Sequence, residues 1–199
     1  MKPSVSVLYN MNIRLLLVPL LIIFAGCATT ANLEKSASDE MTAHFEHQSY
    51  QQKFQLECSQ GLRNYVYQGY PSGLTGSEVK SSINIGETFC ALLDQAETMV
   101  QTGAGENTTM TLDLKSITFT YSYEGTSLWA EKGRDFDAVF ILIKLVADSG
   151  PWFREYTFIA EKEHFDSKVA RNSVKYAVVN SALESIIFQL YEKLYRDFF

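Results

Sequence analysis

Two stretches of the sequence gather side chains that commonly take part in chemistry. In the first, His44, Glu46 and His47 stand within four positions, a spacing that brings side chains together on one face of a helix. A protein metal site needs at least a third firm ligand, and the residue order differs from the His-Glu-x-x-His motif of zinc enzymes. We therefore expect no metal here, but a solvated segment near the start of the fold.

The second stretch combines Glu161, Glu163 and His164 at the end of a predicted strand. A histidine beside carboxylates is the minimum for general acid–base catalysis, so a hydrolase is one hypothesis. A charged loop before the last helix explains the same residues. The sequence has no Gly-x-Ser-x-Gly elbow, no lysine-containing phosphate loop and no Cys-x-x-Cys pair. We expect a protein that is not an enzyme and uses no cofactor.

The N-terminus has the pattern of an export signal. Lys2 and Arg14 precede an uncharged apolar run over residues 15–24, and Ala25 and Gly26 follow it. About ten apolar residues suit a signal-peptide core, whereas a membrane-spanning helix needs roughly 20. Translation can begin at Met1 or at Met11, since both leave the same apolar run.

Phe24-Ala25-Gly26-Cys27 resembles the lipobox of bacterial lipoproteins, with Phe24 in place of the usual Leu, Val or Ile. The resemblance implies a signal peptide over residues 1–26 and acyl chains, palmitate among them, on Cys27. Ala28 stands where an aspartate favours inner-membrane retention, so it implies the outer membrane, facing the periplasm, in a Gram-negative host. A plain secretory signal with a chance cysteine and an uncleaved anchor helix are the alternatives.

The chain after Cys27 is small and polar at first. We expect residues 27–48 to be the acylated cysteine and a flexible tether, and residues 49–199 to form a single periplasmic domain. The formal net charge is −6, and the sequence has no basic stripe. We therefore expect no nucleic acid partner and no electrostatic attraction to anionic lipid. The membrane contact expected is the one made by the acyl chains on Cys27.

Cys58 and Cys90 are the other two cysteines. In an oxidising periplasm this remaining pair favours a disulfide, and two buried reduced thiols are the alternative.

Hydrophobic periodicity indicates the elements of an α+β fold. The predicted order is a strand over 53–58, a second short strand over 63–68, a helix over 86–102, strands over 109–123, 137–147 and 152–162, and a long last helix capped by Asp166 or Ser167. The apolar positions change face at Lys115 and Ser116, which predicts a β-bulge. Residues 79–85 fit either a strand or an extension of the helix.

Together the elements predict an antiparallel sheet of about four strands with two helices packed on one face. The element order over residues 53–199 resembles small envelope lipoproteins, namely the lipopolysaccharide-assembly lipoprotein and the auxiliary lipoproteins of ABC-type transport systems. The resemblance rests on no specific motif and supplies no site residue, because fold analogy does not carry function.

The aromatic residues suggest what the domain does. The last helix carries five of them away from its predicted inner stripe: Phe188, Tyr191, Tyr195, Phe198 and Phe199. Large apolar surfaces are rare on monomers and tyrosine is enriched at interfaces, so we expect these residues to bind a protein partner in the envelope. The predicted function is a lipid-anchored, non-enzymatic accessory or docking subunit. The alternative is a carrier that binds a lipid or another apolar molecule between sheet and helices.

Overall fold

The computed structural model describes residues 29–31, 33, 35–46, 49–50, 54–69, 81–102, 108–124, 135–166 and 176–198. The elements in chain order are β1 (Thr29–Ala31), α2 (Asp39–Glu46), β2 (Ser49–Tyr50), β3 (Phe54–Cys58), α3 (Gln60–Arg63), β4 (Tyr67–Gly69), β5 (Ser81–Ile83), α4 (Ile85–Met99), β6 (Gln101–Thr102), β7 (Thr108–Glu124), β8 (Asp135–Asp148), β9 (Phe153–Asp166) and α5 (Ala177–Phe198).

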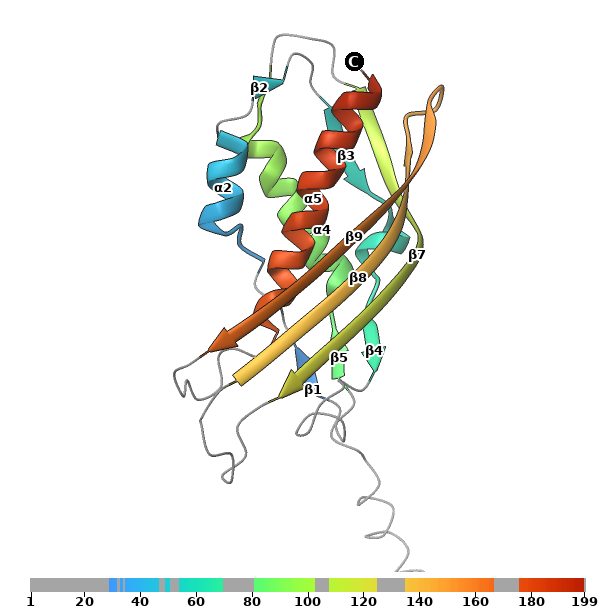
Figure 1. Cartoon of the computed structure of the whole chain (residues 1–199). Helices are drawn as coiled ribbons and strands as arrows, with labels where there is room; N and C mark the ends of the chain where they lie inside the picture. Colours follow the sequence, from blue (N-terminus) through green and yellow to red (C-terminus); the bar gives the residue numbers. More distant parts are fainter. Residues whose placement is uncertain are drawn as a thin grey trace, which may run out of the picture.

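The main sheet has four strands in the order β3-β7-β8-β9, with α4 and α5 against one of its faces (Figure 1). This confirms the predicted α+β class. Strands β7, β8 and β9 form an antiparallel meander, and the register shifts between Leu114 and Ser116 where the bulge was predicted. One detail differs: β3 pairs with β7 in parallel. The chain between them includes α4, and parallel neighbours require a crossover connection of this kind.

Two smaller sheets complete the fold. β5 lies between β1, which is parallel to it, and β4, which is antiparallel, while β2 pairs with β6. The ambiguous segment resolves into both alternatives in turn, because a strand ends at Ile83 and a helix begins at Ile85. The strand predicted over 63–68 is mostly wrong. Ser59 caps a short helix there by accepting a hydrogen bond from the Leu62 N–H, and β4 follows only at Tyr67.

The core fills the layer between the sheet and the helices. The predicted inner stripe of the last helix was Tyr176, Val179, Leu183, Ile186, Leu190 and Leu194. The last five lie on α5 at 0% exposure, whereas Tyr176 precedes the helix and is partly exposed. On the sheet side the inward residues of β8 meet them at Ile141, Ile143 and Leu145, none more than 2% exposed. The predicted caps of this helix are not used: Asp166 ends β9, Ser167 lies outside the described residues, and α5 begins at Ala177.

The predicted tether over residues 27–48 is wrong for its described part. β1 is paired to β5, Leu33 is 7% exposed, and helix α2 buries Met41 and Phe45 completely. Small polar residues suggested mobility, but their backbone and hydroxyl groups are hydrogen-bonded to helices far along the sequence. For example, the Ala37 N–H donates to Gln95 of α4 at 2.9 Å. The folded domain therefore includes Thr29–Ala31 and residues 35–46, which precede the predicted boundary at residue 49.

Candidate partner-binding surface

The aromatic surface predicted on α5 is not an outer face. Helix α2 covers it: the Phe45 ring lies 4.9 Å from Tyr191 and 5.5 Å from Phe188, centroid to centroid, and Tyr191 is 3% exposed. Tyr195 is half-buried and stacks on Tyr191 at 6.3 Å. The side chain of Phe198 and all of Phe199 lie outside the described residues.

The burial of Tyr191 has a simple physical cause. An apolar face on a helix requires cover, and this cover comes from a segment that the sequence suggested was a tether. Tyr191 belongs to the core, and Phe188 and Tyr195 are partly buried against it, so the described aromatic residues of α5 form at most a small part of the surface.

The histidine clusters do not converge on a reactive centre. The His44 ring packs on Phe188 with centroids 4.2 Å apart, and His47 lies outside the described residues. Among the residues that the structure describes, no group of three potential metal ligands comes together. Glu161 and Glu163 alternate with His164 along β9, and successive side chains of a strand point to opposite faces. The carboxylates and the imidazole therefore do not form the acid–base pair of the hydrolase hypothesis.

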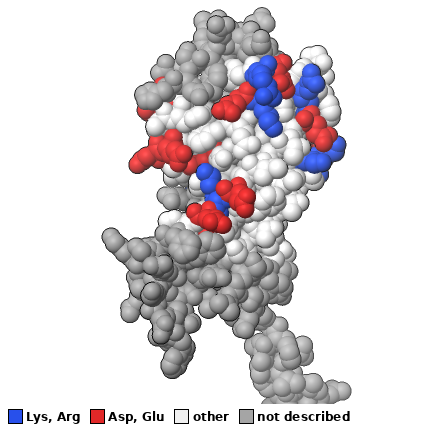
Figure 2. All heavy atoms as spheres, viewed as in Figure 1, with Lys and Arg blue, Asp and Glu red and all other residues white. Residues whose placement is uncertain are grey.

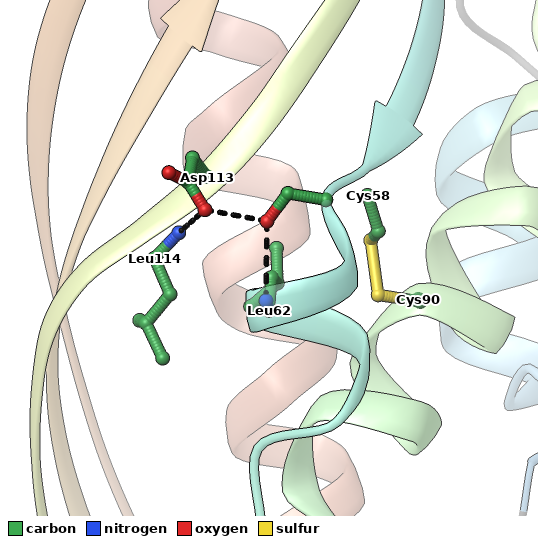
Figure 3. Close-up of a disulfide and its surroundings, with 6 residues drawn as sticks. Cys58, Leu62, Cys90, Asp113 and Leu114 are labelled. Carbon is green, nitrogen blue, oxygen red and sulfur yellow. Dashed lines mark hydrogen bonds between the residues drawn. A yellow bond between two sulfur atoms is a disulfide. The ribbon is translucent and has the colours of Figure 1, made fainter.

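Cys58 and Cys90 form a disulfide that joins β3 to α4 (Figure 3). Cys90 is fully buried, and the Ser59 hydroxyl beside Cys58 donates to the Asp113 carboxylate of β7. The bridge thus holds the edge strand and the helix at the place where α3 begins. Its role here is structural. Cys27, the predicted lipidation site, lies outside the described residues.

The surface that sequence reasoning missed is the other face of the main sheet. Here α5 and α4 are absent (Figure 1). The outward positions of the central strand β8 are Ala138, Phe140, Leu142, Lys144 and Val146, of which only Lys144 is charged. We call this the open face and define it by the outward residues of three cross-strand rows: Ser122, Ala138 and Glu163; Thr120, Phe140 and Glu161; Thr118, Leu142 and Ile159. Ile159 is 53% exposed.

The open face has a depression, and charged side chains occupy only parts of it. Its Ala138, Phe140 and two glutamates line a shallow depression of about 190 Å³. Figure 2 shows that charged side chains on this side of the molecule gather in separate groups, with an uncharged area between them. Lys115 and Glu155 form an ion pair towards the hairpin end, and the hydrogen bond from Lys115 lowers the pKa of Glu155. An apolar centre with a polar rim is the usual anatomy of a protein interface.

The sequence signal for this face was present. Residues 137–147 are apolar at nearly every position, and we took that as the mark of a strand covered on both faces. The helices in the described ranges cover one face, so Phe140, Leu142 and Val146 are only partly buried. Periodicity shows that a side chain is apolar, but not whether another element covers it.

The edges of the same sheet are blocked by side chains from the helices. On β9, Gln189 donates to the Ile159 carbonyl at 3.0 Å and Lys193 to the Thr157 carbonyl at 2.7 Å. On β3, the Leu56 N–H donates to the Glu97 carboxylate. An added strand would have to pair with free backbone N–H and C=O groups of an edge strand. Because these contacts already occupy such groups, they disfavour strand addition at those positions. Recognition by this sheet is therefore better suited to its open face.

Tyr65 and Tyr67 form a second aromatic group, next to β4. Both are half-buried, and burial raises the pKa of each phenol. The Tyr67 ring lies 4.5 Å from Phe119 of β7, which places β4 beside the main sheet. Val66 between the two tyrosines is 39% exposed.

The chain matches no family model and no curated protein in sequence. Solved structures with a similar arrangement include rare lipoprotein B from Shewanella oneidensis, at 10% identity and a TM-score of 0.36, covering 73% of this chain and 98% of that one. A minor lipoprotein from Acinetobacter baumannii is 11% identical with a TM-score of 0.36, covering 73% and 94%. An uncharacterized protein is 12% identical with a TM-score of 0.31, covering 76% and 97%.

None of the helices in the described ranges combines the length and the apolar character needed to cross a bilayer.

Proposed function

We propose that the chain is a lipid-anchored, non-enzymatic envelope protein that docks a protein partner through its open face. The observation that carries the docking is the apolar stretch Ala138, Phe140 and Leu142 on the outward side of β8, which is only partly buried although the strand is internal to the sheet. Phe140 and Leu142 lie at its centre, with the exposed Ile159 beside Leu142 on β9. Burying such side chains against a partner gives about 25 cal/mol for each Å² removed from water.

The anchoring part rests on the lipobox resemblance at Cys27. Two or more acyl chains attach a protein stably to a bilayer without any apolar patch on the folded domain. Ala28 favours the outer membrane over the inner one. An acidic domain held in this way would meet its partner in the periplasm or at the outer membrane.

The carrier alternative receives less support from the packing. It requires space between the sheet and the helices, but in the described core that layer is filled by side chains such as Leu183, Ile143 and Phe158, each at most 2% exposed. Native mass spectrometry of the delipidated protein tests the alternative directly. A co-purifying ligand of defined mass would support the carrier function.

In-cell photo-crosslinking tests the docking surface. A photoreactive phenylalanine analogue at Ile159 should give a crosslinked species of defined mass. The matched control carries the same group at Thr109, an exposed residue near the start of β7. The double substitution Leu142→Lys, Ile159→Lys should abolish co-purification of the crosslinked partner while the domain stays folded. Equal crosslinking from both positions, or an unchanged partner with the double variant, would refute the proposed surface.

Metabolic labelling with a clickable palmitate analogue tests the anchor. The wild type should be labelled and membrane-bound, and a Cys27→Ser variant should be neither. Separation of the two membranes on a density gradient should place the wild type in the outer membrane, and Ala28→Asp should shift it towards the inner one. An unlabelled wild type contradicts the anchoring proposal.

A further inference from the structure

We propose that the domain stands on the bilayer in a fixed orientation, with the end that carries β1, β4 and β5 against the polar interface of the lipid. This inference rests on the proposed acylation of Cys27. Its structural basis is that β1 begins at Thr29 and is paired to β5 in the fold. Only one residue, Ala28, separates Cys27 from that strand.

The chain length sets how far the lipid can be from the domain. An extended chain covers at most about 3.6 Å per residue, so the Cα atoms of Cys27 and Thr29 are no more than about 7 Å apart. The register places Thr29 level with Ser81 of β5 and Gly69 of β4. The acyl chains must therefore enter the bilayer close to this row, which brings the end of the small sheet to the membrane surface.

The segment after β1 is also bonded to the domain, so it does not act as a flexible tether. Lys35 is ion-paired with Glu87 in the first turn of α4, and its carbonyl accepts from Gln95. Ser38 is bonded to Glu184 of α5 at 2.8 and 2.6 Å. Even if β1 detached, the chain would be fixed again at Lys35, close to the start of the helix that follows β5.

The opposite end of the domain is far from the anchor. Tyr67 of β4 packs beside Phe119 of β7, and the end of β7 that pairs with the β8–β9 hairpin is Thr111, opposite Asp148. Eight residues of strand separate Phe119 from Thr111, roughly 26 Å at about 3.3 Å per residue. Figure 1 shows β1, β4 and β5 at one end of the molecule, with the hairpin and the C-terminal end of α5 at the other.

The side chains beside β4 suit the headgroup region. Tyr67 has a half-buried ring and lies two residues from Gly69 in the row of Thr29, and Val66 before it is 39% exposed. Tyrosine is enriched where a membrane meets water because its ring is apolar and its hydroxyl is polar. The expected ligand is therefore the polar interface of a phospholipid bilayer.

Fluorescence quenching by lipid tests the orientation on the full, acylated chain. Acylation consumes the Cys27 thiol and the disulfide consumes the other two, so an introduced cysteine is the single labelling site. One variant is Gln68→Cys, on the exposed side of β4, and the matched control is Phe153→Cys, 62% exposed at the hairpin. Each carries the same fluorophore in phosphatidylethanolamine–phosphatidylglycerol vesicles that contain a headgroup nitroxide lipid.

Quenching should be several-fold greater at position 68 than at position 153. A flexible Gly/Ser insert of about 20 residues between Ala28 and Thr29, which reaches roughly 25 Å, should remove most of that difference. Equal quenching at both positions, or stronger quenching at 153, in a chain that is palmitate-labelled and vesicle-bound overturns the orientation but leaves the anchor standing. A chain that is neither labelled nor bound overturns both proposals.

Discussion

Glu184 of α5 accepts two hydrogen bonds from Ser38, one from its backbone N–H at 2.8 Å and one from its hydroxyl at 2.6 Å, across 146 positions of sequence. The same hydroxyl accepts from the Met41 N–H and so caps helix α2. This contact holds the N-terminal segment on the two-helix layer. It explains why residues that look like a linker are part of the domain.

The first prediction concerns this contact. Glu184→Ala leaves two donors of Ser38 without their acceptor, and the carboxylate that it removes is 4% exposed. We expect the free energy of unfolding to fall by about 1–3 kcal/mol, measured by urea denaturation. Glu192→Ala, an exposed change on the same helix, should cost less than about 0.5 kcal/mol. Similar losses from the two substitutions would contradict a specific role for Glu184.

The second prediction concerns the disulfide. Cys58 and Cys90 are 32 positions apart, and closing a loop of that length stabilises a protein by about 3–4 kcal/mol in the chain-entropy model. Adding a reductant should therefore lower the urea midpoint of the wild type. The double variant Cys58→Ala, Cys90→Ala should unfold at the same lowered midpoint with or without reductant. A wild type that is insensitive to complete reduction would disprove this contribution.

The third prediction uses two glycines in neighbouring helices. A Cβ at Gly86 would lie 2.0 Å from the Leu62 carbonyl oxygen and 2.9 Å from the Tyr65 nitrogen, both of them backbone atoms. Gly86→Ala must push α3 and α4 apart, and we expect a loss of at least about 2–3 kcal/mol. At Gly61 the nearest atom is 3.5 Å away, so Gly61→Ala should be neutral or stabilise by up to about 1 kcal/mol. Thermal unfolding of both variants makes the comparison.

The fourth prediction checks which face of β9 is covered. Phe158 is fully buried and its neighbour Ile159 is 53% exposed. Phe158→Ala should cost about 3–5 kcal/mol, since it opens a cavity in the core. Ile159→Ala should change the unfolding free energy by no more than about 0.5 kcal/mol. The reverse order of effects would mean that the register of β9 is shifted by one residue and that the open face is wrongly assigned.

The fifth prediction concerns alkaline pH. The Tyr156 hydroxyl donates to Asp197 at 2.9 Å, and burial together with this carboxylate raises the pKa of Tyr156. A pKa that is raised in the folded state gives stability that is complete below the unfolded value near 10 and is lost as the pH rises above it. The stability advantage of the wild type over Tyr156→Phe should therefore shrink above about pH 10. Urea midpoints measured between pH 8 and pH 11 would show this, and a constant difference would contradict it.

Much of the fold follows from local patterns. The bulge beside Lys115, the long strands of the meander and the buried stripe of α5 were all predictable, because the alternation of apolar and polar side chains within one element reflects which of its faces is covered. The helix predicted over 86–102 begins within one residue of the observed α4 and ends three residues later than it does. Cys58 and Cys90 were also the natural pair, being the two cysteines left after Cys27.

The candidate surface was decided by contacts between distant segments. Whether Tyr191 lies in the core or on the surface depends on Phe45, and whether Leu142 is covered depends on which sheet face the helices occupy. The pairing of β1 with β5 depends likewise on backbone groups some 50 positions apart. The sequence by itself determined the apolar stripe of each element, and from it we predicted the export signal and the lipidation of Cys27. Only the tertiary structure decided which stripes are covered and that Thr29–Ala31 pair with β5, because burial and pairing depend on the neighbours that folding brings together.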